Sequence, residues 1–324
     1  MGKRILLTGA TGFVGGRLYP ALVEAGHEVR CGTRNPQRAA RRDPTRQWVE
    51  LDLHRPELVQ AAVEGIEVVY YLVHSMAEGH GYAQRELESA RGVMAAAEQA
   101  GVERIIYLGG VAPAGSPSEH LSSRLETGRL LRSGAVPCIE LRAGMIIGAG
   151  SASWTICRDL AARLPFMILP RWLETRSQPA SVEDIVAALA GAATVECTES
   201  AVYDLPGPEV LAAKEILMRI AALRGTEPLT INVPLLSPKL SSYWLKLISG
   251  ADFSIARELV EGLKSDLIAT ETPFWEQLEG HQLVPFDEAA RRALAEQGPG
   301  SLRSRALEAV TRWLSRRRKT AESP

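Results

Sequence analysis

Three glycines near the start of the chain have a spacing that suits phosphate binding. Gly9, Gly12 and Gly15 lie in the stretch "ILLTGATGFVGGRL", between an apolar run and an apolar helical pattern. In a strand–turn–helix context, one glycine lets the chain turn, one lets the backbone approach a pyrophosphate, and one lets the helix pack against the strand. The N-terminus of that helix then attracts the phosphates. The spacing therefore predicts a dinucleotide-binding loop.

The end of the second apolar run bears on the choice of dinucleotide. Proteins that prefer NAD usually place an acidic residue there, to bind the ribose hydroxyls. This chain reads "CGTRNPQRAARR", with Arg34 at the end of the run and no acid. A guanidinium suits a 2′-phosphate through charge-assisted hydrogen bonds. We therefore expect NADP(H) rather than NAD(H), with Arg34 as the determinant and the later arginines as a solvated helix face.

The elements that must position these residues alternate along the first half of the chain. Strand-like runs are expected at 4–8, 27–34, 47–53, 67–73, 104–110 and 137–148. Helical patterns separate them, and glycines such as Gly26 and Gly101 mark helix ends. Strands that are apolar on both faces and separated by helices are typical of a parallel sheet covered on both sides. The sequence therefore predicts an α/β fold with a doubly wound parallel sheet of the Rossmann type.

Composition excludes several other classes of protein. The 324 residues carry a formal net charge of −1, which provides no overall field to attract nucleic acid. No apolar run reaches the roughly 18 residues of a membrane-spanning helix. The four cysteines form no Cys-x-x-Cys pair and lie near no histidine cluster. We expect reduced thiols, no metal site and a cytoplasmic location.

The motifs also resemble a known superfamily. "TGATGFVG" resembles the cofactor loop of the extended and atypical short-chain dehydrogenase/reductases. "YLVHSM", "LRAGMIIGAGSASW", "LPRWLETRSQPASVEDI" and "LSSYWLKLI" resemble a bacterial NAD(P)-binding branch related to NmrA-like sensors and to the accessory nucleotide-binding subunit of respiratory complex I. The resemblance spans about residues 3–290. It implies that the cofactor is held by Gly9, Thr11, Gly12, Phe13, Val14, Gly15, Asp52, Leu53, Leu72, Val73, His74, Gly109, Arg124, Ala143 and Gly144; His74 could instead face the substrate.

The catalytic residues of the superfamily are replaced in this chain. Most members carry a Ser that orients the substrate carbonyl, a Tyr that transfers the proton and a Lys four residues later. Here Gly109 and Gly110 occupy the Ser region, while His120 and Arg124 take the Tyr and Lys positions. Imidazole can carry a proton near neutral pH, and a guanidinium stays charged and can hold hydroxyls. The pair is either a modified acid–base site or part of a site that binds cofactor without turnover.

The resemblance also implies the domain organisation. Residues 1–150 should form the dinucleotide-binding domain, completed by about 177–206. Residues 151–176 and 207–298 should form a smaller C-terminal subdomain that caps the substrate, with Met145, Trp154 and Trp172 beside it. Residues 299–324 form a basic amphipathic pattern. A packed or solvated helix is favoured there over contact with an anionic membrane surface.

These expectations lead to two hypotheses about function. The first is an NADP(H)-dependent oxidoreductase that acts on an unknown carbonyl or quinone. The alternative is a catalytically silent dinucleotide-binding redox sensor or assembly factor. The absence of the usual Tyr and Lys argues against a third class, the nucleotide-sugar epimerases and dehydratases.

Overall fold

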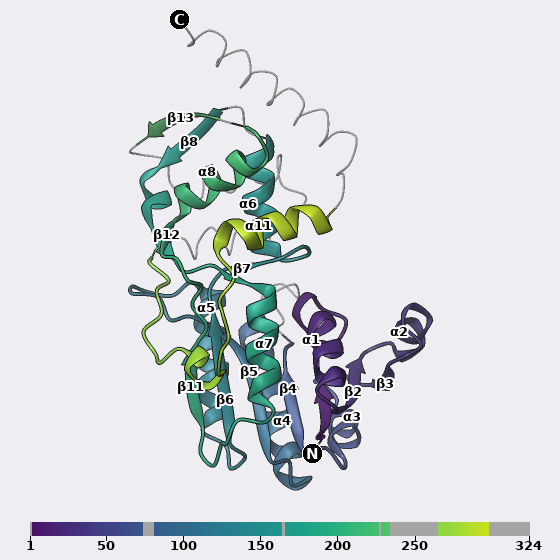
Figure 1. Ribbon diagram of the computed structural model, residues 1–324. Helices are drawn as coiled ribbons and strands as arrows, with labels where there is room; N and C mark the ends of the chain where they lie inside the picture. The colour runs from purple at the N-terminus through teal and green to yellow at the C-terminus, as the bar shows by residue number, and fades with distance from the viewer. Residues whose placement is uncertain (1, 74–80, 164–165, 227, 234–264, 298–324) are drawn as a thin grey trace, which may run out of the picture.

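A seven-stranded parallel sheet forms the centre of the first lobe (Figure 1). The computed structural model describes residues 2–73, 81–163, 166–226, 228–233 and 265–297. The strand order is β11-β6-β5-β4-β1-β2-β3, and every neighbouring pair is parallel. The strands are β1 (Arg4–Leu7), β2 (Glu28–Thr33), β3 (Gln47–Glu50), β4 (Val68–Tyr71), β5 (Arg104–Gly110), β6 (Cys138–Ala143) and β11 (Ala201–Asp204). The order reverses between β1 and β4, and ligands of such sheets bind outside the strand carboxyl ends at this point.

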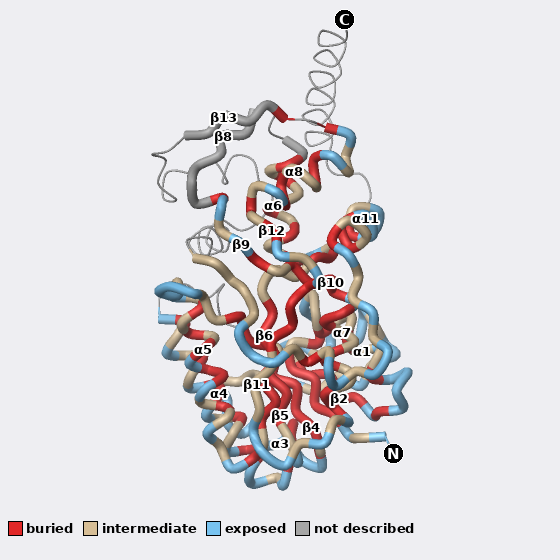
Figure 2. The backbone as a smooth tube through the Cα atoms, turned by 60° about the vertical axis from the view of Figure 1, so that its left-hand side comes forward, coloured by how far each residue is buried: buried red, intermediate tan, exposed pale blue. Residues whose placement is uncertain are grey.

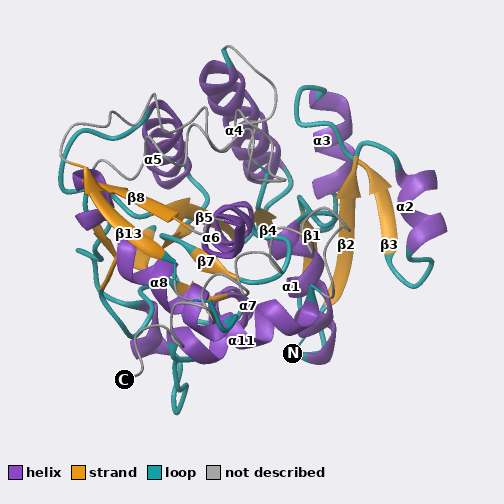
Figure 3. Cartoon of the chain, turned by 90° about the horizontal axis from the view of Figure 1, so that it is seen from above, coloured by secondary structure: helices purple, strands orange, loops and turns teal. Residues whose placement is uncertain are grey.

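Helices cover both faces of this sheet, which confirms the doubly wound α/β prediction (Figure 3). One face packs against α1 (Phe13–Glu24) and α7 (Val182–Ala192), and the other against α3 (Pro56–Val63), α4 (Tyr82–Gln99) and α5 (Glu119–Arg132). The short α2 (Pro36–Arg42) connects β2 and β3. Figure 2 shows buried residues concentrated along the strands and on the sheet-facing sides of these helices.

The second lobe lies beyond the carboxyl ends of the strands (Figure 1). Its elements are β7 (Ile146–Ile147), α6 (Ala152–Arg163), β8 (Phe166–Pro170), η2 (Arg171–Glu174), β9 (Arg176–Ser177), β10 (Ala180–Ser181), β12 (Leu211–Ala212), α8 (Ala213–Leu223), β13 (Leu229–Val233) and α11 (Phe286–Glu296). Its core is a separate apolar cluster that includes Trp154, Ile220 and Phe286. Among the described residues, no helix is both long and apolar enough to cross a bilayer. The expected C-terminal tail, 299–324, lies outside the described residues.

A late segment of the chain returns to the first lobe. Phe274, in η3 (Phe274–Gln277), is fully buried in the apolar cluster between the sheet, α1 and α7. The indole Nε1 of Trp275 donates to the carbonyl of Pro206 at 2.8 Å. His281 Nε2 lies 2.9 Å from Oδ1 of Asp184, a buried carboxylate in the first turn of α7. These contacts attach the segment to α7 and to the end of β11.

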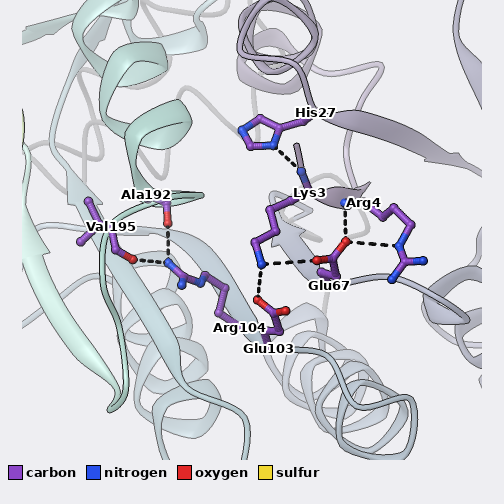
Figure 4. A network of polar contacts seen from close by, with 8 residues as sticks. All are labelled: Lys3, Arg4, His27, Glu67, Glu103, Arg104, Ala192 and Val195. Carbon is purple, nitrogen blue, oxygen red and sulfur yellow. Dashed lines mark hydrogen bonds and ion pairs between the residues drawn. The ribbon is translucent and has the colours of Figure 1, made fainter. Parts of the chain in front are cut away.

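A polar network ties the strands together at the end of the sheet opposite the second lobe (Figure 4). Lys3 Nζ lies 3.3 Å from Glu67 and 2.7 Å from Glu103, which joins β1 to the starts of β4 and β5. The backbone N–H of Lys3 donates to His27 Nδ1 at 2.9 Å. Arg104 donates to carbonyls at the end of α7 and just beyond it. This end of the sheet is therefore occupied by structural contacts.

Candidate functional site

The turn between β1 and α1 requires glycine at two positions for steric reasons. Gly9 has φ +65°, in the left-handed region, and a Cβ there would lie 2.9 Å from the carbonyl oxygen of Leu72. A Cβ on Gly15 would lie 2.4 Å from the carbonyl oxygen of Gly9, so α1 packs directly on the turn. L-residues with side chains rarely adopt the first conformation, and they cannot make the second approach.

Gly12 has a different role, because it leaves the start of α1 open. Its N–H donates to Gly9 O at 2.8 Å, and it is the N-cap residue of α1, with no side-chain cap. A Cβ on Gly12 would have one atom within 4 Å, the carbonyl oxygen of Gly9 at 3.1 Å. Thr11 is exposed, and Phe13 and Val14 are half-buried. The bare backbone and the N–H groups of the first helical turn fit the pyrophosphate of a dinucleotide.

The neighbouring strand β4 continues the site. The N–H of Leu72 donates to Oγ1 of Thr8 at 3.0 Å, which fixes the chain after β4 beside the glycine turn. Leu72 and Val73 are half-buried. His74 lies outside the described residues. The structure therefore brings Gly9, Leu72 and Val73 to one point, at the reversal of the strand order.

The ends of β2 and β3 lie on the other side of this point. Arg34 directly follows β2 and is exposed. Its neighbour Asn35 caps α2 by accepting a hydrogen bond from the backbone N–H of Arg38 at 2.9 Å. Asp52 and Leu53 follow β3 and are half-buried. These residues lie at the edge of the sheet where the adenosine half of a dinucleotide is expected.

The carboxyl ends of β5 and β6 form the opposite end of the site. Gly109 pairs with Arg142, and Gly110 pairs with Ala143. A Cβ on Gly109 would lie 2.9 Å from Oε1 of Glu140, and a Cβ on Gly110 would lie 2.7 Å from Leu121 on α5. The space that a side chain at position 109 needs is therefore already filled.

Glu140 fills that space, and sequence reasoning missed it. Its carboxylate is fully buried, 2.8 Å from Nε of Arg132 and 2.9 Å from Nε of Arg142. A Cβ on Gly128 of α5 would lie 2.2 Å from Glu140 Oε1. The helix can therefore pack over Glu140 only because residue 128 has no side chain. The sequence feature that could have revealed Glu140 is a lone acid in the apolar run "PCIELRAGMIIG".

His120 and Arg124 lie one turn apart on α5, as their spacing predicts. His120 is half-buried in the first turn of the helix. The guanidinium of Arg124 donates to the carbonyl of Leu108 in β5 and lies 5.9 Å from the ring centre of Tyr107. The hydroxyl of Tyr107 donates to Arg124 O at 3.1 Å, and burial raises the pKa of this tyrosine. Tyr107 is thus a structural support for Arg124.

A second buried acid lies beside this pair, and the sequence reasoning also missed it. Glu86 of α4 is 1% exposed, and its Oε2 accepts a hydrogen bond from Oγ of Ser123 at 2.8 Å. Burial raises the pKa of Glu86, against the opposing effects of the Ser123 hydrogen bond and the charge of Arg124. Burial therefore makes the charged form of Glu86 less favourable than that of an exposed glutamate.

The residues expected near the nicotinamide, Ala143 and Gly144, and those expected near the substrate lie in different environments. Ala143 is buried, while the position of a Cβ on Gly144 has no atom within 4 Å and is open. Met145 is half-buried and packs against the core of the second lobe, where Trp154 is fully buried. Trp172 lies in η2, and its side chain is outside the described part of the structure.

Comparison with known proteins agrees with this geometry. Residues 9–158 match a family described as NAD(P)H-binding. A 3-beta-hydroxysteroid dehydrogenase from Mycolicibacterium neoaurum is 34% identical over 114 residues. That match covers 32% of this chain and 31% of the dehydrogenase, so this chain spans about a third of the length of that relative.

Solved structures share the fold over a larger part of the chain. An NADPH-dependent quinone oxidoreductase from Escherichia coli, in complex with NADPH, is 22% identical with a TM-score of 0.70, covering 90% of this chain and 99% of its own. A nucleoside-diphosphate-sugar epimerase from Staphylococcus aureus is 20% identical with a TM-score of 0.69, covering 90% and 100%. Residues 9–158 thus match an NAD(P)H-binding family, and most of the chain shares the fold of these solved reductase and epimerase structures.

Proposed function

We propose that the protein is an NADP(H)-dependent oxidoreductase that reduces a carbonyl or quinone substrate. The observation that supports this most directly is the arrangement at the carboxyl edge of the sheet. The glycine turn lies at the reversal of strand order, and the pair His120 and Arg124 lies beside the ends of β5 and β6. A dinucleotide with its phosphates at the turn would extend toward that pair.

The preference for NADP(H) rests on Arg34. Its exposed guanidinium directly follows β2, next to the capped start of α2, and no acid occupies the end of that strand. A 2′-phosphate at this position would receive a charge-assisted hydrogen bond, which contributes about 1.5–3 kcal/mol.

The roles of the residues follow from their positions. NADPH, when bound, would supply the hydride that the substrate takes up. The backbone N–H groups at the start of α1 hold the pyrophosphate, and the open position at Gly144 leaves room above β6. Arg124 holds ribose hydroxyls with a fixed positive charge. His120 donates the proton that the substrate oxygen takes up, so that a carbonyl gains one hydride and one proton.

Two observations favour the alternative, a dinucleotide-binding sensor without turnover. The carboxylate of Glu140 occupies the space beside Gly109, so no side chain from that position can orient a substrate carbonyl. The guanidinium of Arg124 is also engaged by the carbonyl of Leu108. In that case the two residues would contribute to affinity alone.

A turnover measurement separates the two functions. NADPH oxidation would be followed with a panel of aldehydes, ketones and quinones, with NADH in parallel. His120→Asn should lower turnover about 100-fold, the scale of general acid–base catalysis, and leave the Kd for NADPH unchanged. Ser122→Ala, two residues along the same helix, serves as the matched control. Tight NADPH binding without any turnover would support the sensor, and equal affinity for NADH would contradict the NADP(H) preference.

A further inference from the structure

Helix α1 carries a proline where a regular helix would need an N–H group. Pro20 lies inside α1, and its ring nitrogen cannot donate a hydrogen bond. In an α-helix the carbonyl of residue i accepts from the N–H of residue i+4, so the carbonyl of Gly16 lacks its helical donor. Gly16 lies in the first turn of α1, directly after the glycine-rich turn, and its own N–H donates to Gly12 O at 2.9 Å.

Arg46, from the connection between α2 and β3, lies at that carbonyl. Its Nη2 is 3.5 Å from Gly16 O, and its Nη1 is 3.4 Å from the carbonyl oxygen of Ala10 in the turn itself. The guanidinium lies 4.2 Å from the ring centre of Tyr19. Each polar contact is long, but one charged group reaches both carbonyls at once.

Asp43 holds the guanidinium in this place. Its Oδ2 accepts from Arg46 Nε at 2.6 Å, and its Oδ1 accepts from the hydroxyl of Thr45 at 2.5 Å. The carbonyl of Asp43 accepts from the indole N–H of Trp48 at 2.8 Å. Hydrogen bonds from Thr45 and then Arg46 lower the pKa of Asp43, so the carboxylate stays ionised at neutral pH. The connection before β3 thus forms a fixed support against α1.

We propose that Arg46 is a positioning residue for the dinucleotide-binding turn. Pro20 contributes to this role, because it leaves the carbonyl of Gly16 without a helical donor and so available to Arg46. The Ala10–Thr11 peptide is planar and trans, so its C=O and N–H point in opposite directions. A donor that holds the carbonyl of Ala10 therefore also fixes the direction of the Thr11 N–H. This inference deepens the proposed cofactor site and rests on it.

Two measurements on Arg46→Met test the role. In the free protein, hydrogen exchange of the amides in residues 8–18 should become faster, because the turn loses its support. By calorimetry, NADPH and NADH should both bind about tenfold more weakly, the effect of one lost charged hydrogen bond, with an unchanged ratio between them. Arg42→Met, on the exposed end of α2, should change neither readout. In a Pro20→Ala background the effect of Arg46→Met should be smaller, because residue 20 then supplies the N–H to Gly16.

The outcomes distinguish this role from the others. Unchanged exchange in residues 8–18 overturns the inference whether or not nucleotides bind. Weaker binding of NADPH alone also overturns it, since Arg46 would then act on the 2′-phosphate. If the wild-type protein binds neither nucleotide, the proposed function fails, and the dinucleotide role of Arg46 fails with it. Should Arg46→Met not fold, Arg46→Lys is measured in the same two ways, because a single ammonium cannot span both carbonyls.

Discussion

Introducing the serine of the superfamily at Gly109 should destabilise the protein. A Cβ there would lie 2.9 Å from Glu140 Oε1 and 3.3 Å from Cε1 of Tyr107. The carboxylate of Glu140 cannot move away from position 109. The backbone of α5 at Gly128 lies directly against it on one side, and Arg142 holds it in the sheet. Overpacking of this kind costs about 1–3 kcal/mol. Breaking a buried ion pair costs about 3–5 kcal/mol. We expect a loss of about 2–4 kcal/mol for Gly109→Ser, between these two limits.

Urea-induced unfolding provides the assay. The free energy of unfolding of Gly109→Ser is compared with that of Gly144→Ser, because no atom lies within 4 Å of a Cβ at Gly144. The control should lie within about 0.5 kcal/mol of wild type, as for other open positions. Shortening the acid in the double variant Gly109→Ser/Glu140→Asp should recover part of the loss. A change under about 0.5 kcal/mol for Gly109→Ser alone would refute the view that Glu140 is fixed.

Three further predictions concern the cofactor site and its surroundings. Gly12→Val should abolish dinucleotide binding by calorimetry while cooperative unfolding is retained, because the side chain would enter the space of the pyrophosphate; an unchanged Kd would contradict the assignment of the turn. Arg34→Ala should weaken NADPH binding about 10–100-fold and leave NADH nearly unchanged, with Arg42→Ala as control; equal losses for both nucleotides would argue against a 2′-phosphate contact. Burial raises the folded-state pKa of Glu86 above its unfolded value, so its favourable contribution is present at low pH and is lost as the pH rises through the folded pKa. Glu86→Gln should therefore gain stability relative to wild type in urea unfolding as the pH rises above the unfolded-state pKa of about 4.3, whereas the exposed Glu88→Gln should not. A difference that stays constant with pH would contradict the prediction.

The sequence predicted the parts of the structure that local patterns determine. The glycine spacing identified the turn because the positive φ of Gly9 and the close approach at Gly15 leave no other residue type. The alternation of strand-like and helical patterns was sufficient to predict the doubly wound sheet.

Long-range contacts account for what the sequence did not reveal. One strand was expected over 137–148, but β6 ends at Ala143 and Ile146 pairs with β10 in the second lobe. The partner of Ile146 lies more than thirty residues along the chain, so no local pattern marks this break. Glu140 and Glu86 were missed for the same reason, because their partners Arg132 and Ser123 come from other elements.

The return of Phe274 to the first lobe has a consequence for how the protein is made. The ribosome completes β6 at Ala143, yet its edge partner β11 ends at Asp204, and the ring that closes the cluster at α7 comes only at Phe274. Translation at ~5–20 residues per second separates Ala143 from Phe274 by roughly 7–26 s. Until β11 is made, the nascent chain carries an unpaired strand edge at β6. Until Phe274 is made, the apolar cluster beside α7 lacks one of its buried side chains. The first lobe is thus begun well before the chain supplies its last core residue, and during that interval its exposed strand edge needs protection from aggregation.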